Sequence, residues 1–157
     1  MIPELNPRQR AWVEVSPAAI RANARALCQH LDPRTQLMAV VKADGYGHGA
    51  ETVARAALQG GATSLGVATL QEGLELRRVG LEAPVLVLSN LNEPDDLRTC
   101  LHWRLMPTLS SLRDAQLCNA LAADSGRCFD VQLKIDTGMA RLGCSLSEGH
   151  QTAAELK

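Results

Sequence analysis

The sequence has few aromatic side chains, no cluster of basic residues and no long apolar run. Phe, Trp and Tyr make up 3% of the 157 residues, so a core must be built from Leu, Val, Ile and Ala. The apolar fraction of 46% is sufficient for one domain with such a core. The net charge of -1, without a basic block, argues against a nucleic-acid partner. No run is long enough to cross a membrane.

The cysteines fit neither a disulfide framework nor a metal site. Their number is odd, and none forms a CxxC pair or has zinc-ligand spacing. We therefore expect free, mostly buried thiols in a reducing compartment, and no metal. The first ten residues also lack the basic-then-apolar layout of a secretion signal. The five residues are Cys28, Cys100, Cys118, Cys128 and Cys144.

Short apolar segments alternate with amphipathic segments along the whole chain. A strand is predicted over 11–15 and a helix over 16–31, with Ser16 as N-cap and Pro17 at the first helical position. About five strand–helix units then follow, at the spacing of βαβ units. Their predicted strands are 36–42, 64–68, 84–89, 104–110 and 128–136; their predicted helices are 49–62, 69–80, 93–103, 111–126 and 146–157. The expected helix ends include a start at Thr69 or Leu70, an end at Gly126 and a cap at Ser147 or a nearby residue.

Two α/β architectures compete for this pattern. Strands that are apolar on both faces indicate a parallel sheet, either open and doubly wound or closed as a (β/α)₈ barrel. The glycines after the strand 36–42 are Gly45, Gly47 and Gly49, which is not the GxGxxG spacing of dinucleotide-binding sheets. A barrel needs about 250 residues, so this sequence would supply just over half of one.

The segment "LMAVVKADGYGHGA" (Leu37–Ala50) places one lysine at the end of an apolar strand. The amine of Lys42 would lose solvation there, which favours its neutral form and suits it to form a Schiff base with an aldehyde. The alternative is a rim lysine that pairs with Asp44. The glycines let the backbone approach a ligand closely, and the Tyr46 hydroxyl suits a phosphate. His48 is either a further donor or a packed or capping histidine.

A second lysine lies near the end of the last predicted strand. Lys134 is followed by Arg141 in "LKIDTGMARLG", and the carboxyl ends of parallel strands are where active groups collect. From position alone, Lys134 is as well explained as a routine rim lysine.

Together these motifs resemble those of one family, the alanine racemases. "VVKADGYGHGA" is similar to that family's pyridoxal-phosphate attachment motif, and "LKIDTGMARLG" to a second family segment. "AWVEVSPAAIRANARAL" and "EGLELRRVGLEAPVLVLSN" are also similar, so the resemblance runs in register from about residue 11 to residue 143.

The resemblance implies a fold and an activity. Alanine racemases have an N-terminal (β/α)₈ barrel, a mostly β C-terminal domain and a homodimeric assembly. Residues 1–157 would then be the N-terminal part of the pyridoxal-phosphate-binding barrel, a partial TIM-type barrel without the C-terminal β domain. The implied reaction interconverts L-alanine and D-alanine for peptidoglycan precursors, which implies a location in the cytoplasm.

The resemblance also implies roles for individual residues. Lys42 would bind the cofactor and exchange the substrate α-proton on the D-alanine side. Tyr46 would contact the cofactor phosphate. Arg141 would lie near the cofactor's phenolic oxygen and contribute to substrate binding. Lys134 corresponds to a lysine that is often carbamylated in this family and then orients that arginine.

One departure from the family pattern bears on activity. The family's second base is a tyrosine of the partner's C-terminal domain, but Tyr46 is the only tyrosine in this sequence. We therefore expect this chain by itself to be poorly active or inactive. The alternatives are a serine or broad-specificity racemase, a non-catalytic pyridoxal-phosphate carrier, and a fragment that binds nothing.

Overall fold

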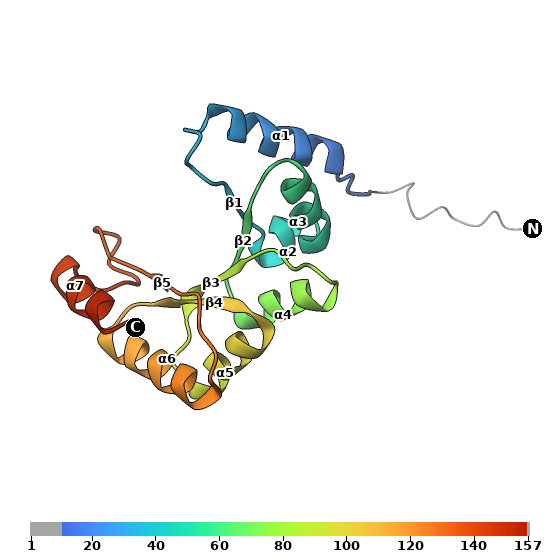
Figure 1. Cartoon of the computed structure of the whole chain (residues 1–157). Coiled ribbons are helices and arrows are strands. Elements are labelled where there is room, and N and C mark those ends of the chain that lie inside the picture. The colour runs from blue at the N-terminus through green and yellow to red at the C-terminus, as the bar shows by residue number, and fades with distance from the viewer. Residues whose placement is uncertain (1–10, 157) are drawn as a thin grey trace, which may run out of the picture.

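A computed structural model describes residues 11–156 as alternating helices and parallel strands (Figure 1). The strands are β1 (Met38–Val40), β2 (Ser64–Val67), β3 (Val85–Asn90), β4 (Leu105–Leu109) and β5 (Gln132–Leu133). The helices are α1 (Pro17–His30), α3 (Ala50–Gln59), α4 (Leu70–Arg78), α5 (Pro94–Trp103), α6 (Leu112–Ser125) and α7 (Leu146–Glu155), and α2 (Lys42–Gly47) is a short helical turn. None of these helices is long and apolar enough to span a membrane.

The order of the strands decides between the two predicted architectures. Within residues 11–156 the sheet runs β1-β2-β3-β4-β5, and every neighbouring pair is parallel. A doubly wound sheet reverses its order at a switch point, whereas a barrel adds each strand beside the previous one. Figure 1 shows α3, α4, α5 and α6 following one another in an arc around the sheet. The fold is therefore a part of a β/α barrel, as the sequence predicted.

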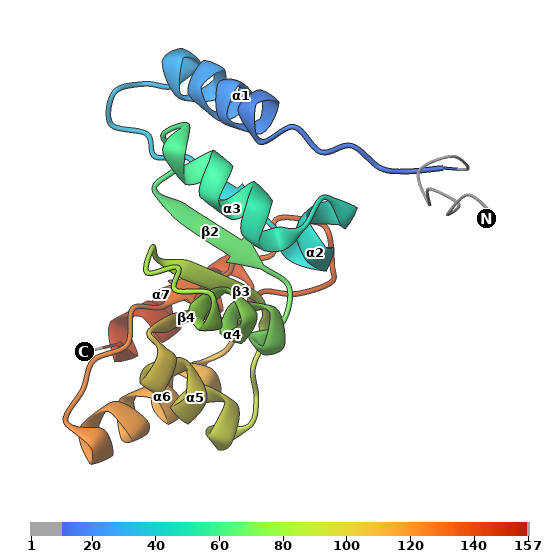
Figure 2. The ribbon, with the colours of Figure 1, turned by 90° about the vertical axis from the view of Figure 1, so that its right-hand side faces the viewer.

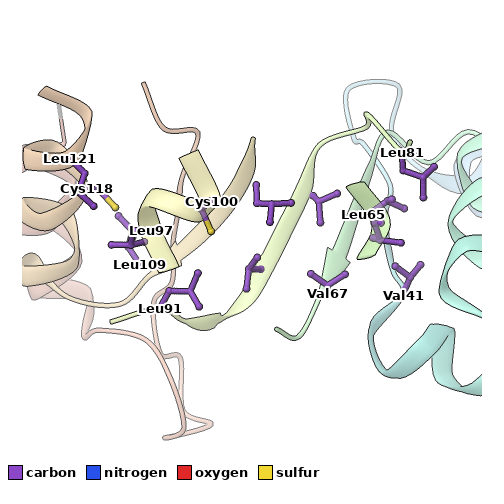
Figure 3. Packing of buried hydrophobic residues seen from close by; sticks show 14 of the residues in the cluster. Val41, Leu65, Val67, Leu81, Leu91, Leu97, Cys100, Leu109, Cys118 and Leu121 are labelled. Carbon is purple, nitrogen blue, oxygen red and sulfur yellow. The ribbon is translucent and has the colours of Figure 1, made fainter. Parts of the chain in front are cut away.

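The main core lies between the sheet and the helices that cover it (Figure 3). Leu65 and Val67 of β2 and Leu97 of α5 are fully buried in this layer. Cys100 and Cys118 also lie there, and burial raises the pKa of Cys100 to about 12 and that of Cys118 to about 11. Both cysteines are buried and unpaired, which confirms the prediction at these two positions, and both thiols stay protonated at neutral pH.

Most helix ends follow the predicted capping residues. The Ser16 hydroxyl caps α1, and Thr69 caps α4 in a reciprocal capping box. Gly126 ends α6 in the left-handed conformation that glycine tolerates best. Gly60 has a second role, because a Cβ there would lie 2.5 Å from the Arg21 carbonyl oxygen of α1. Its missing side chain lets α1 and α3 pack closely.

The sequence prediction was wrong at two strands. Residues 11–15 form no strand, because they pair with no other segment of the described chain. The predicted strand 128–136 shrinks to Gln132–Leu133, since only these residues pair with β4. The N-cap of α7 is Ser145, which agrees with the prediction of a cap at Ser147 or a nearby residue.

Candidate functional site at the carboxyl end of β1

The chain leaves β1 through one turn of left-handed helix. Ala43, Asp44, Gly45 and Tyr46 have φ between 51° and 61° and ψ between 35° and 50°. A left-handed conformation costs an L-residue roughly 1–2 kcal/mol, and three of these four residues are not glycine. Strained backbone of this kind persists only where the surrounding structure enforces it, and it concentrates at functional sites. Lys42 lies immediately before this turn.

The turn brings Lys42 and Tyr46 together. The Lys42 Nζ lies 5.9 Å from the centroid of the Tyr46 ring. Lys42 is half-buried, whereas 59% of the Tyr46 surface is exposed. Figure 2 shows α2 beside the arrowhead of β2, which is the carboxyl end of the sheet. An amine and a hydroxyl therefore lie together at the carboxyl end of the sheet, which is where parallel α/β folds bind ligands.

Polar groups on both sides hold the turn in place. The Gly45 amide donates to the Val41 carbonyl over 2.9 Å, and the Ala50 amide donates to Asp44 Oδ1 over 2.7 Å. No ion pair joins Lys42 to Asp44 in residues 11–156, so the rim pair considered above does not form. The Nδ1 of His48 lies 3.1 Å from the Tyr46 carbonyl oxygen, which makes His48 a capping histidine here.

Lys134 and Arg141 lie after β5, the strand at the opposite edge of the described sheet from β1. Lys134 follows β5, and its main-chain amide donates to the Leu109 carbonyl over 2.8 Å. Arg141 lies in the exposed loop between β5 and α7. No hydrogen bond or ion pair among the described residues joins either side chain to the other or to Lys42.

Asp136 shapes the loop that carries Arg141. One carboxylate oxygen accepts the amides of Gly138 over 3.0 Å and Ala140 over 3.1 Å. Ala140 has a φ of 53°, and a Cβ at Gly143 would lie 2.6 Å from the Asp136 nitrogen, so the loop closes tightly. The two backbone donors lower the pKa of Asp136 from its usual 3.8, because they favour the charged carboxylate.

This shift predicts how the loop responds to acid. The folded-state pKa is below the unfolded one, so the carboxylate stabilises the loop above pH 3.8 and loses this effect as the pH falls through the lowered pKa. In an NMR titration, the Gly138 and Ala140 amide shifts should show a midpoint below 3.8. Asp136→Asn should abolish the titration, whereas Asp130→Asn, which lies outside this loop, should leave it unchanged. A midpoint at or above 3.8 would contradict this assignment.

The hollows at the other end of the sheet involve none of the predicted site residues. One of about 350 Å³ is lined by Cys100, Arg104, Arg127 and Phe129 among others, and another of about 530 Å³ is lined by residues that begin the strands. In residues 11–156, no group of three or more His, Cys, Asp or Glu side chains could hold a metal ion.

Sequence reasoning missed two features of the site. It did not predict the left-handed turn, and it did not single out Glu72 of α4, whose carboxylate accepts the amide next to Lys42 over 2.8 Å. The Thr69–Glu72 spacing was a visible signal for a capping box, but nothing local points from Glu72 to Ala43.

The fold and the site define a class of protein. The chain is part of a parallel β/α barrel with a lysine at the carboxyl end of its first strand. Comparison with known proteins makes the class specific. Residues 15–157 match the family model described as "Alanine racemase, N-terminal domain". The chain belongs to the alanine racemase family.

Individual relatives agree with the family match. An alanine racemase of Prochlorococcus marinus is 64% identical over 143 residues, which are 91% of this chain and 37% of that protein. A crystal structure of alanine racemase from E. faecalis has a TM-score of 0.80 and 36% identity and covers 89% of this chain. One from Bacillus anthracis with bound L-Ala-P has a TM-score of 0.80 and 32% identity and covers 92% of this chain. The chain spans 38% of each of these two structures.

Proposed function

We propose that residues 1–157 are the N-terminal part of a pyridoxal-phosphate-dependent alanine racemase, and that Lys42 is its cofactor lysine. The observation that carries this proposal is the placement of Lys42. Lys42 is half-buried at the carboxyl end of β1, directly before a strained left-handed turn, and its amine lies beside Tyr46. The family match and the relatives' names support the reaction assigned to it.

The residues at the carboxyl end of β1 have side chains that could bind pyridoxal phosphate. Lys42 would form the covalent bond to the cofactor aldehyde through its amine, which makes no ion pair among the described residues. The Tyr46 hydroxyl would donate to the phosphate. When bound, pyridoxal phosphate acts as an electron sink for the substrate α-carbon.

Lys42 and Arg141 would act on the substrate. The Lys42 amine would remove and return the α-proton on the D-alanine side, as a general base and then a general acid. Arg141, held by the loop that Asp136 closes, would bind near the phenolic oxygen and the substrate, and Lys134 would orient it, with carbamylation giving Lys134 an anionic end. In the whole protein, a homodimer in the cytoplasm would supply D-alanine for peptidoglycan precursors.

Trapping the covalent adduct tests the proposal. The chain has only Lys42, Lys134 and Lys157 as lysines, so the modified amine can be mapped unambiguously. The chain is incubated with pyridoxal phosphate, reduced with borohydride and digested for mass spectrometry. We expect the adduct on Lys42, its loss in Lys42→Arg and its retention in Lys134→Arg.

The outcomes separate the competing functions. No adduct, or equal labelling of all three lysines, would refute the assignment of Lys42. A carrier would form the adduct but would not exchange the α-hydrogen of D-alanine with deuterated water. The racemase assignment expects that exchange with D-alanine and not with L-alanine, since Lys42 serves one face only.

A further inference from the structure

We propose that Glu72 is a positioning residue for Lys42: its carboxylate fixes the left-handed turn on which the lysine stands. This inference rests on the proposed function of Lys42. Glu72 is the third residue of α4 and belongs to the next β/α unit along the chain. It therefore couples the first strand's loop to the second strand's helix.

The Glu72 carboxylate accepts three backbone amides. Its Oε1 accepts the Ala43 amide over 2.8 Å. Its Oε2 accepts the amides of Ala68 over 2.6 Å and Thr69 over 3.1 Å. One side chain thus ties the loop after β1 to the loop after β2, and both loops lie at the carboxyl end of the sheet.

The bond to Ala43 exceeds what a helix cap requires. A capping box needs only the Thr69 amide bonded to Glu72 and the Glu72 amide bonded to the Thr69 hydroxyl, and both bonds are present. The Ala43 amide lies 29 positions away in the sequence and contributes nothing to the start of α4. Its position, directly after Lys42 and first in the left-handed turn, makes the bond relevant to the site.

The turn needs an anchor of this kind from outside. Its other hydrogen bonds come from its own residues, from the residues directly flanking it or from α3, such as the Asp44 bond to the Ala50 amide. Glu72 supplies the bond from α4, which α2 also contacts. Without it, Ala43 would be free to leave its unfavourable φ of 51°, and the Lys42 side chain would no longer be held beside Tyr46.

The Glu72 carboxylate bonds to backbone amides and does not pair with Lys42. No ion pair joins Glu72 to Lys42 in residues 11–156, and the carboxylate faces amides at the positive end of α4. A glutamine has the same shape but presents an amino group in place of one oxygen. Glu72→Gln therefore removes at least one acceptor and sets a donor against a donor.

The experiment compares Glu72→Gln with two matched variants in the 157-residue chain. Thr69→Ala weakens the same helix cap but keeps the Ala43 bond. Glu75→Gln makes the same change three residues later on α4, where the side chain accepts only from Gln71. Two quantities are measured: the pyridoxal phosphate concentration that half-saturates the reduced Lys42 adduct, and amide hydrogen exchange in peptides covering 41–49.

We expect Glu72→Gln to raise the half-saturating concentration at least tenfold and to speed exchange in 41–49. Thr69→Ala and Glu75→Gln should stay within twofold of the unmodified chain on both readouts. Equal effects of Glu72→Gln and Thr69→Ala would overturn the proposal, because capping alone would then explain them. If Glu72→Gln does not fold, Glu72→Asp, which keeps the charge but shortens the reach, is compared with Thr69→Ala on the same two readouts.

The two readouts keep this inference separate from the proposed function. If the unmodified chain forms no Lys42 adduct, the assignment of Lys42 fails. Hydrogen exchange still shows whether Glu72 holds the turn, and unchanged exchange in the Glu72 variants would overturn that part as well.

Discussion

Gly45→Ala should destabilise the chain by about 2–5 kcal/mol and abolish cofactor attachment to Lys42. Gly45 is buried with a φ of 61°, and an added Cβ would lie 2.8 Å from Val53 Cγ2 of α3. The left-handed backbone costs an alanine roughly 1–2 kcal/mol, and overpacking costs about 1–3 kcal/mol more. Urea unfolding measures the loss of stability, and borohydride trapping measures the adduct.

Gly47→Ala is the matched control for Gly45→Ala. Gly47 also has a positive φ, 82°, but a Cβ added there would meet no other atom within 4 Å. It should therefore show only the backbone cost of about 1–2 kcal/mol. Adding Val53→Ala to Gly45→Ala should recover part of the stability by removing the contacting methyl group. Equal losses of stability for Gly45→Ala and Gly47→Ala would show that the close approach of Gly45 to α3 adds no cost to the substitution.

Arg77→Ala should lower the melting temperature on the order of 10 °C, through a loss of about 2–4 kcal/mol. The Arg77 guanidinium donates to four main-chain carbonyls at the amino end of the sheet. It bonds Leu81 and Ala83 in the connection to β3, and Trp103 and Arg104 at the end of α5. Burial, and then the nearby Arg104, lower the pKa of Arg77, so its carbonyl partners offset the cost of a half-buried charge.

Arg78→Ala provides the comparison for Arg77. Arg78 is the exposed neighbour on α4, so its removal should change stability by less than about 0.5 kcal/mol. Arg77→Lys should recover little, because a single ammonium cannot reproduce the planar fork that reaches two connections at once. Calorimetry of the three variants measures these differences. Similar melting temperatures for Arg77→Ala and Arg78→Ala would contradict the role of Arg77 as a link between successive units.

The sequence predicted the elements whose signals are local. Ser16, Thr69 and Gly126 act at helix ends where their side chains or backbone conformations are favourable, and the structure has them as caps. Local signals failed where an element depends on a partner. Residues 11–15 alternate like a strand but pair with nothing described, and β5 is only as long as its contact with β4.

Lys42, Tyr46, Lys134 and Arg141 were all singled out from the sequence, yet only the first two come together among the described residues. Their roles stay predictions. Motif resemblance identifies residue types at strand ends, but it does not determine which side chains meet. That depends on how the strands are ordered and how the loops close.

By itself, the sequence determined the alternation of strands and helices, the parallel sheet and the family, because apolar periodicity, caps and motifs are written in consecutive residues. Only the tertiary structure decided that the strands lie in sequential order and that the chain after Lys42 is left-handed. Ala43, Asp44 and Tyr46 each disfavour that conformation locally. The carboxylate of Glu72 and the close packing of Gly45 on α3 hold them there, and both contacts exist only after the chain has folded.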